Sequence, residues 1–456
     1  VVIMAKLTCQ RTVVPAAHKS VIYQLFLRAF TPEGTLNAAS ELLPHLAELG
    51  IDIVYLCPIC VHDPDENPDF WSDRQKASGC NNPKNPYRIS DYYHVEPEYG
   101  TDDDLKRFIR RAHGLGMKVM LDLVYFHCGP TAALIAEHPD FVVRNEDGSI
   151  INGQWHFPKL NFDNPALREY LFDNMVYYVN DFDADGYRTD VGDGIPLDFW
   201  EEARRRLDKI NPDLIMLNEG FSAASMVNAF DVLYGFHWAS TLRNMLLSGK
   251  PVSTLSTTWL EDRERLPEGA LMTRHYDNHD LASDDYGHRF ERVLDKRQID
   301  NVIIMNMTMD GVPLLYNGDE IGDGRRHSLF ASPALNPGFT IDWAQALTER
   351  GQDRLALVTE LIALRHGEEL LTEGDMALVP TAEPEKVFAF RRFSEYEDGQ
   401  IFVFVNFSNE PVKCAVEADI DDFAAATILS RGGNLSFENG RPVLELLPYG
   451  ALIVRA

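Results

Sequence analysis

The feature that most constrains the fold is an alternation of short apolar runs with segments of helical spacing. The runs are rich in β-branched and aromatic residues, and between them apolar residues recur every three or four positions. Eight runs lie at residues 21–26, 51–57, 118–124, 186–190, 214–218, 230–234, 271–276 and 312–316. Because parallel strands need a crossover between them, eight strand–helix pairs favour a closed α/β barrel, a (β/α)8 TIM barrel, over an open sheet.

The rest of the chain divides around this barrel. We assign residues 1–127 and 165–373 to the barrel. Residues 128–164 are irregular and too long for an ordinary connection, so we expect a small inserted domain after the third strand. Beyond about Gly374 the apolar pattern has period two, which predicts a C-terminal all-β sandwich domain over 374–456. Its strands are expected at 386–393, 401–406, 412–416, 425–429 and 451–455.

The charge of the chain limits its partners. The net charge is −28, from 42 basic and 70 acidic residues. Such a surface disfavours nucleic acid and anionic membranes, whereas a neutral sugar is not repelled. No apolar run reaches the ~20 residues that a membrane span needs. We therefore expect an oligosaccharide or polysaccharide as the partner, and the oligomeric state stays open.

The compartment is judged from the N-terminus and the cysteines. Residues 1–10 lack the basic start and apolar core of a secretion signal. The six cysteines are scattered and do not form a disulfide framework, so reduced thiols are expected. Cys57 and Cys60 have the spacing of a redox or zinc half-site, but no second pair accompanies them. These observations predict a cytoplasmic protein.

Polar residues gather where the predicted barrel strands end. In chain order these are Asp122, His127, Arg188, Asp190, Glu219, Asn278, His279 and Asp280. α/β barrels place their chemistry at this end of the strands, so these carboxylates and histidines should meet at one site. Arg188 and Asp190 share a strand face, and the arginine favours the ionised form of the aspartate. On its own this pair also fits a purely structural role.

Two kinds of chemistry fit this set. Neighbouring carboxylates with separated pKa values suit retaining glycoside hydrolysis, in which the two carboxyl groups lie about 5 Å apart. Asp, His and Glu at barrel strand ends also suit a divalent-metal hydrolase. Arg188 beside Asp190, however, opposes a bound cation. The residues therefore favour sugar chemistry over metal chemistry.

At this point the motifs resemble those of the α-amylase family, glycoside hydrolase family 13, over essentially the whole chain. The similar stretches are Asp122–His127, Gly186–Asp190, Leu217–Gly220, Asn278–Asp280, Asn85–Tyr87 with Asp91–Tyr93, and Gly311–Glu320. By this resemblance Asp190 is the nucleophile and Glu219 the general acid/base. Asp280 would grip the 2- and 3-hydroxyls of the sugar and stabilise the transition state.

The same resemblance implies a set of substrate-binding residues. Tyr87 would stack on the sugar at the cleavage site, and His127 and His279 would hydrogen-bond it. Arg188 would keep Asp190 ionised. Asp122 would support Arg188 from behind, and a buried structural role for it remains open. Trp155 and Trp71 lie in loops where they could stack on sugars, whereas Trp238 opens a helix and is expected in the core.

Several residues depart from the family pattern. Phe126 stands where many amylases have an asparagine that ligates structural calcium, and Val191-Gly192-Asp193 replaces the usual residues after the nucleophile. Both changes remove calcium ligands, so no cofactor is expected. Arg88 replaces an aspartate that exo-acting glucosidases use to hold a terminal glucose. Val191, by contrast, resembles members that accept α-1,6 bonds.

The expected function is retaining hydrolysis of α-1,4 bonds in starch-derived maltooligosaccharides. A transglycosylase or a sucrose- or trehalose-type isomerase could use the same covalent intermediate. A catalytically inactive amylase-like binding protein is a third alternative, but such proteins usually lose one of the three acids, and all three are present here.

Overall fold

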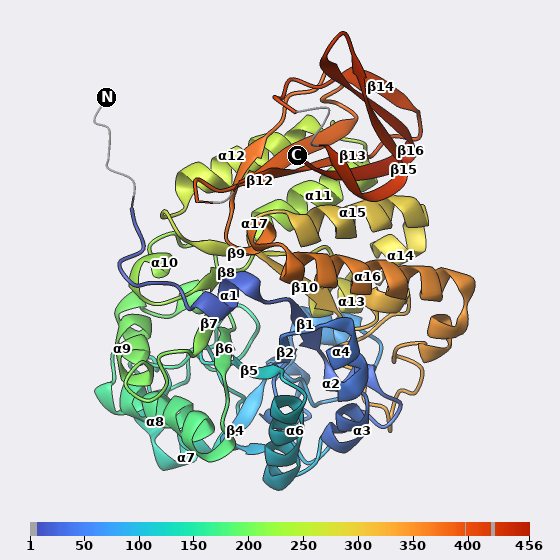
Figure 1. Ribbon diagram of the computed structural model, residues 1–456. Helices are drawn as coiled ribbons and strands as arrows, with labels where there is room; N and C mark the ends of the chain where they lie inside the picture. Colours follow the sequence, from blue (N-terminus) through green and yellow to red (C-terminus); the bar gives the residue numbers. More distant parts are fainter. Residues whose placement is uncertain (1–6, 397, 421–424) are drawn as a thin grey trace.

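The centre of the molecule is a closed barrel of eight parallel strands (Figure 1). The computed structural model describes residues 7–396, 398–420 and 425–456. Residues 1–6, part of the segment examined for a secretion signal, lie outside it. The strands are β1 (Ile22–Leu25), β2 (Ile53–Leu56), β5 (Lys118–Leu123), β6 (Gly186–Thr189), β7 (Ile215–Asn218), β8 (Val232–Leu233), β9 (Leu271–Arg274) and β10 (Val312–Tyr316). Since β1 pairs with both β2 and β10, the expected TIM barrel is confirmed.

Helices surround the barrel strands (Figure 1). The longer ones are α3 (Leu36–Glu41), α4 (Leu43–Leu49), α6 (Asp102–Gly114), α8 (Pro165–Phe182), α9 (Leu197–Leu207), α11 (Phe236–Ser248), α12 (Ser253–Arg265), α15 (Lys296–Thr308) and α16 (Glu349–Gly367). Short helices are α1 (Pro15–Lys19), α2 (Leu27–Phe30), α5 (Asp73–Ala77), α7 (Ala133–Glu137), α10 (Ser225–Asn228), α13 (His279–Asp284), α14 (Phe290–Val293) and α17 (Glu369–Thr372). Within the described residues, none is long and apolar enough to cross a bilayer.

Two helices differ from the sequence expectation. The spacing of apolar residues over 38–49 predicts a single helix that stops at Gly50. In the structure α3 and α4 meet at Leu42, because Pro44, which lacks an amide hydrogen, fits only the first turn of a new helix. Helix α12 was not expected, since its sequence begins with serines and threonines of modest helix propensity.

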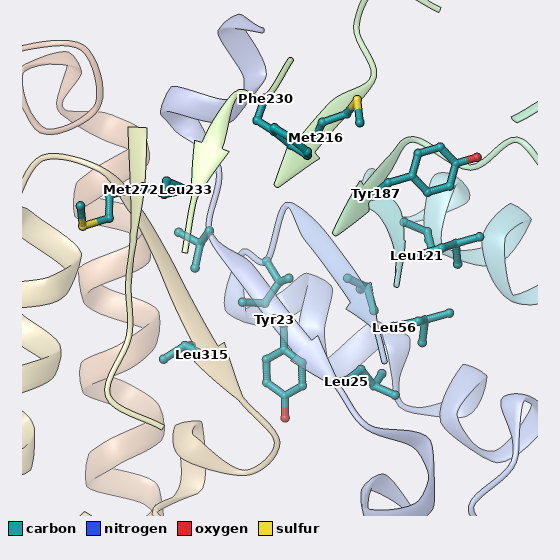
Figure 2. Close-up of a cluster of buried hydrophobic side chains, with 14 of the residues drawn as sticks. Tyr23, Leu25, Leu56, Leu121, Tyr187, Met216, Phe230, Leu233, Met272 and Leu315 are labelled. Carbon is teal, nitrogen blue, oxygen red and sulfur yellow. The ribbon is translucent and has the colours of Figure 1, made fainter. Parts of the chain in front are cut away.

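Alternate side chains of each barrel strand fill the interior. Ile22, Ile53 and Met120, one from each of three strands, form part of an inner cluster with residues of the other strands. Val13 and Val14 join this cluster at the N-terminal ends of the strands and close that end. The intervening residues face the helices and form the larger core, where Figure 2 shows Tyr23, Tyr187, Met216 and Met272 among others.

The C-terminal domain is antiparallel, as expected. Its strands are β11 (Asp375–Leu378), β12 (Val387–Phe393), β13 (Gln400–Asn406), β14 (Val412–Ala415), β15 (Ala426–Glu438) and β16 (Arg441–Arg455). The last two are much longer than predicted, because Asn439 and Gly440 adopt the positive φ of a tight hairpin turn. One side of the sheet encloses a separate apolar core, and the other joins the main core beside α15.

Two segments after β2 and β5 rise above the C-terminal end of the barrel. In the first, β3 (Cys60–His62) pairs antiparallel with β4 (Ile89–Val95), which the sequence did not reveal, and α5 lies in the loop between them. The second, residues 128–164, holds α7 and isolated bridges such as Val142 with Leu160. Both segments contribute walls to the site described below.

Candidate active site

A cavity of about 120 Å³ opens at the C-terminal end of the barrel. Of the eight residues to which the family resemblance gives a catalytic or substrate-binding role, six line it: Asp190, Glu219, Asp280, Tyr87, His127 and His279. They come from the ends of β5, β6 and β9, from the turn after β7 and from the loop before β4. The three carboxylates, distant in the chain, therefore share one pocket.

The two remaining predicted residues, Asp122 and Arg188, lie one layer deeper and do not line the cavity. They face each other directly in the β5–β6 register, and both are buried inside the barrel. Asp122 accepts hydrogen bonds from Tyr55 at 2.6 Å and from Arg188 at 2.8 Å. With its carboxylate engaged by these partners, Asp122 is placed to support Arg188 rather than to contact substrate, although it was grouped with the substrate-binding residues. Asp122 and Arg188 position other side chains.

Arg188 links the acids of the pocket. Its Nη1 lies 2.8 Å from Asp122 Oδ1 and 2.9 Å from Asp190 Oδ1, and its Nη2 lies 2.5 Å from Glu219 Oε1. A fully buried guanidinium is stable only when paired, and three surrounding carboxylates provide that pairing. Because one planar group contacts both Asp190 and Glu219, these two carboxylates are held close together.

The protonation of this pair differs from the sequence expectation. Arg188 was expected to keep Asp190 ionised. Burial and the charge of Glu219 instead raise the pKa of Asp190 well above its usual range, and Arg188 offsets only part of this. Arg188 therefore holds in place an aspartate whose pKa is raised by burial and by its acidic neighbour.

The turn after β6 positions Glu219. This role of the turn was not predicted from the sequence. Val191 adopts a left-handed conformation, with φ of 48°, which is strained for a β-branched residue. In this conformation its amide donates to Glu219 Oε2 at 2.8 Å. A Cβ atom at Gly192 would lie 2.0 Å from Asn218 Oδ1, so the turn also requires that glycine.

Asp193 holds the segment that follows Glu219. Its carboxylate accepts from Asn218 Nδ2 at 2.9 Å and from the amides of Phe221 and Ser222 at 2.5 and 2.9 Å. The sequence showed only that Asp193 replaces a family residue. Its contacts assign it to fixing the turn that carries Glu219.

Tyr87 and His279 form a hydrogen-bonded chain through the pocket wall. The Nδ1 of His279 lies 2.7 Å from Gln24 Nε2, and its Nε2 lies 2.8 Å from the Tyr87 hydroxyl. Since an amide nitrogen only donates, Nδ1 accepts and Nε2–H donates to Tyr87. Tyr87 in turn donates to Asp122 at 3.1 Å. Burial lowers the pKa of His279, so the ring is neutral and already fully hydrogen-bonded.

His127 keeps one acceptor available. Burial lowers its pKa to about 4, so the ring is neutral near pH 7. Its Nε2 donates to the Tyr87 carbonyl at 2.7 Å, whereas Nδ1 has no partner in the part of the chain that the structure describes. Trp155 and Phe157 pack on the ring and also line the cavity. A bound hydroxyl could thus donate to Nδ1.

Asp280 stands in the first turn of α13 and is engaged by Arg74, a residue that the sequence did not single out. Arg74 Nη2 donates to Asp280 Oδ1 at 2.6 Å, and its Nε contacts Asp284. Burial alone would raise the pKa of Asp280, but positively charged neighbours such as Arg74 and Arg188 outweigh it and hold that pKa well below the usual range. Asp280 is therefore a permanently ionised acceptor.

Other residues named from the sequence lie outside the pocket. Trp238 is buried in the core, as expected. Trp71 is buried and donates to the Asp65 carbonyl at 3.2 Å, so it is not a sugar platform in this structure. Arg88 is buried and donates to the carbonyls of Phe70 and Pro83, which makes it a structural residue of the loop.

One cluster of potential metal ligands occurs among the described residues, formed by His62, Glu96 and Glu98. Arg28 donates to Glu98 at 2.9 Å, and Lys84 pairs with Glu96. The protein's own cations therefore neutralise this cluster.

The chain was also compared with known proteins. The family model described as alpha amylase, catalytic domain, matches residues 12–146 and 151–354. A cyclomaltodextrinase of a Bacillus species is 24% identical over 416 residues, which cover 83% of this chain and 66% of the relative. An intracellular maltogenic amylase of Bacillus subtilis is 26% identical over 75% of this chain and 57% of the relative. The chain thus spans about two thirds or less of the length of these two relatives.

Solved structures resemble it over nearly its full length. A maltogenic alpha-amylase from Thermotoga neapolitana superimposes with a TM-score of 0.82 at 24% identity, covering 96% of this chain and 98% of that one. An alpha-amylase from Lactobacillus plantarum gives a TM-score of 0.79. These similarities establish a shared fold of barrel and C-terminal sheet domain.

Proposed function

Because this chain belongs to the α-amylase family of glycoside hydrolases, we propose that it hydrolyses α-1,4-glucosidic bonds of starch-derived maltooligosaccharides by a retaining mechanism. The observation that carries the proposal is the contact of one buried arginine, Arg188, with both Asp190 and Glu219. Retaining enzymes need their two carboxyls about 5 Å apart, whereas inverting enzymes leave room for a water between them. The names of relatives that act on maltodextrins support the substrate class.

The geometry supports a two-step reaction. An oxygen of Asp190 attacks the anomeric carbon while the bond to the glycosidic oxygen breaks, and the proton of Glu219 moves to the departing oxygen. A covalent glycosyl ester on Asp190 results. Glu219 then takes a proton from water, whose oxygen attacks the same carbon and releases Asp190 as a carboxylate. Two inversions at the carbon preserve its configuration.

The raised pKa of Asp190 predicts the pH dependence. Asp190 must be ionised to attack, so kcat/KM should fall on the acid side as this carboxylate becomes protonated. Because burial and the charge of Glu219 raise that pKa, the acidic limb of the profile should lie above the usual carboxyl range. A profile flat from acidic to alkaline pH would contradict this account.

The remaining pocket residues fit recognition of a sugar ring. Asp280 presents an ionised acceptor for hydroxyl groups, and His127 Nδ1 is a second acceptor. Trp155 and Tyr87 offer aromatic surface beside the carboxylates. A ring with hydroxyls along its edge and apolar faces needs this combination of groups.

The residues around Phe126 do not fit the calcium ion that many family members carry. Phe126 packs edge-on against Trp155 at 6.0 Å between ring centres, and a Cβ at Gly194 would lie 2.7 Å from the Phe126 ring. An apolar ring fills the place of an oxygen ligand, and calcium requires oxygen ligands. We therefore propose that the enzyme needs no calcium.

A time course on maltoheptaose, with and without a chelator, tests the proposed function. We expect shorter maltooligosaccharides at equal rates under both conditions. Products longer than the substrate would indicate a transglycosylase instead. Loss of activity with the chelator would contradict the calcium proposal, and no turnover of any α-glucan would contradict the function.

We also propose a cytoplasmic location. The six cysteines are all free in the structure, which suits a reducing compartment. The relative from Bacillus subtilis carries the name intracellular maltogenic amylase.

A further inference from the structure

Arg74 closes one side of the pocket. It projects from α5 in the loop between β3 and β4, lines the cavity, and spans to Asp280 and Asp284 on α13. Two carboxylates thus hold one guanidinium across the gap between α5 and α13. The side chain remains 39% exposed, so it lies at the rim of the pocket rather than in its floor.

The loop that carries Arg74 is itself fixed. The Ser72 hydroxyl caps α5 by accepting from the Gln75 amide at 3.2 Å. Gln75 Nε2 donates to the carbonyls of Asn82 and Pro83 at 2.8 and 3.0 Å. Buried Arg88 ties the same loop together through the Phe70 and Pro83 carbonyls. The segment that carries Arg74 is therefore held in place by several hydrogen bonds.

A second segment, residues 322–341, meets this loop from the other side. Leu329 and Phe330 of this segment line the cavity. Behind them, Asn336 Nδ2 donates to the Cys80 carbonyl at 3.2 Å, and Arg326 Nη1 donates to the Ser78 carbonyl at 3.3 Å. The two segments are thus joined behind the pocket on the side where Arg74 lies.

The proposed reaction indicates which part of the substrate lies at the side of the pocket that Arg74 closes. Glu219 protonates the departing oxygen, so the released sugar lies on the side of Glu219 and Val191. By the family resemblance, Asp280 grips the 2- and 3-hydroxyls of the bound ring, and the 4-hydroxyl is next to the 3-hydroxyl. The 4-position is opposite the anomeric carbon across the ring, so a further donor sugar would extend past Asp280. That space is where Arg74 bridges Asp280 and Asp284.

We propose that Arg74 is the end wall of the donor side and that the enzyme removes single glucosyl units from the non-reducing ends of α-glucans. The inference rests on the proposed function and adds the position of cleavage. Arg74 is then a specificity-determining residue, because its side chain leaves no room for a second glucosyl unit on the non-reducing side of the cleaved bond.

A substrate pair tests this without any variant. The first is maltoheptaose carrying a fluorophore at its reducing end, and the second is the same compound with a cyclic acetal on its non-reducing 4- and 6-hydroxyls. We expect labelled products that shorten by one unit at a time from the first, with glucose released. The second should react at least about 100-fold more slowly, because the acetal meets the wall.

Arg74→Ala provides the complementary test, with Lys76→Ala on the same helix as the control. Opening the wall should raise the initial ratio of maltose to glucose by about tenfold and reduce the discrimination against the blocked substrate by a similar factor. Lys76→Ala, an exposed change outside the pocket lining, should leave both ratios unchanged. Arg74→Lys should lie between, since one ammonium cannot bridge both carboxylates.

The outcomes separate the two proposals. Rapid cleavage of the blocked substrate by the unaltered enzyme, or maltose as its first product, would overturn the end-wall role while leaving α-glucan hydrolysis intact. Unchanged ratios in a folded Arg74→Ala variant would also overturn it. No cleavage of either substrate would refute the proposed function, and the inference with it.

Discussion

Asp190→Asn is expected to lower hydrolysis of maltooligosaccharides by about four to six orders of magnitude, as removal of a nucleophile does in other covalent enzymes. The amide has nearly the shape of the carboxylate but cannot form the glycosyl ester. The variant should still fold. Burial and Glu219 raise the pKa of Asp190, so its ionised form destabilises the fold progressively as pH rises from the ordinary carboxyl pKa to the raised one. At neutral pH the variant should therefore be at least as stable as the parent.

The measurement is kcat/KM on maltoheptaose, together with chemical unfolding of both proteins. Asp198→Asn is a suitable control, because this exposed acid on α9 pairs only with Arg168 among the described contacts. It should leave both activity and stability nearly unchanged. Turnover by Asp190→Asn within about tenfold of the parent would contradict the nucleophile assignment.

Glu219→Gln is expected to show a loss that depends on the leaving group. Maltooligosaccharides have poor leaving groups, so their hydrolysis should fall by about 10³–10⁴-fold when proton donation is lost. An activated aryl α-glucoside leaves without a proton and should lose far less in the first step. Arg188 and the Val191 amide each donate to a different oxygen of Glu219, so the single oxygen of glutamine can accept from only one of them.

Rates on the two substrate types, measured side by side, test this prediction. Equal losses on both substrates would assign Glu219 a binding role instead.

The barrel and the central acids could be predicted because their signals are local. Arg188 and Asp190 are two residues apart on one strand, and Asp122 follows the same alternation on the neighbouring strand. Strand length and inward-facing periodicity therefore place all three without long-range information. Glu219 lies one strand–helix unit further along, which puts it on the adjacent strand end.

Other features could not be predicted because they depend on contacts between distant segments. Arg74 meets Asp280 across 206 positions of the chain, and nothing in the sequence around Asp73–Ala77 marks that partner. The pairing of β3 with β4 likewise depends on a loop whose own pattern is irregular. The length of β15 and β16 arises from pairing with each other and from register shifts that the period-two pattern does not encode.

The pKa of Asp190 could not be predicted for the same reason, because it depends on contacts that form only when the chain folds. Arg188, two residues away, favours the ionised form of Asp190. It is the one influence on this pKa that we identified from the sequence. Folding adds burial and brings Glu219 to the opposite end of the same guanidinium, and these raise the pKa instead. Neither contribution is visible before the strands are assembled.

The most direct test of the account is to trap the covalent intermediate. A 5-fluoro-α-glucosyl fluoride supplies a good leaving group while its ring fluorine slows the second step, so the ester should accumulate. Mass spectrometry of the intact protein should show one added fluoroglucosyl group, and peptide mapping should place it on Asp190. An unlabelled protein that still turns the compound over, or a label on another residue, would contradict a retaining mechanism through Asp190.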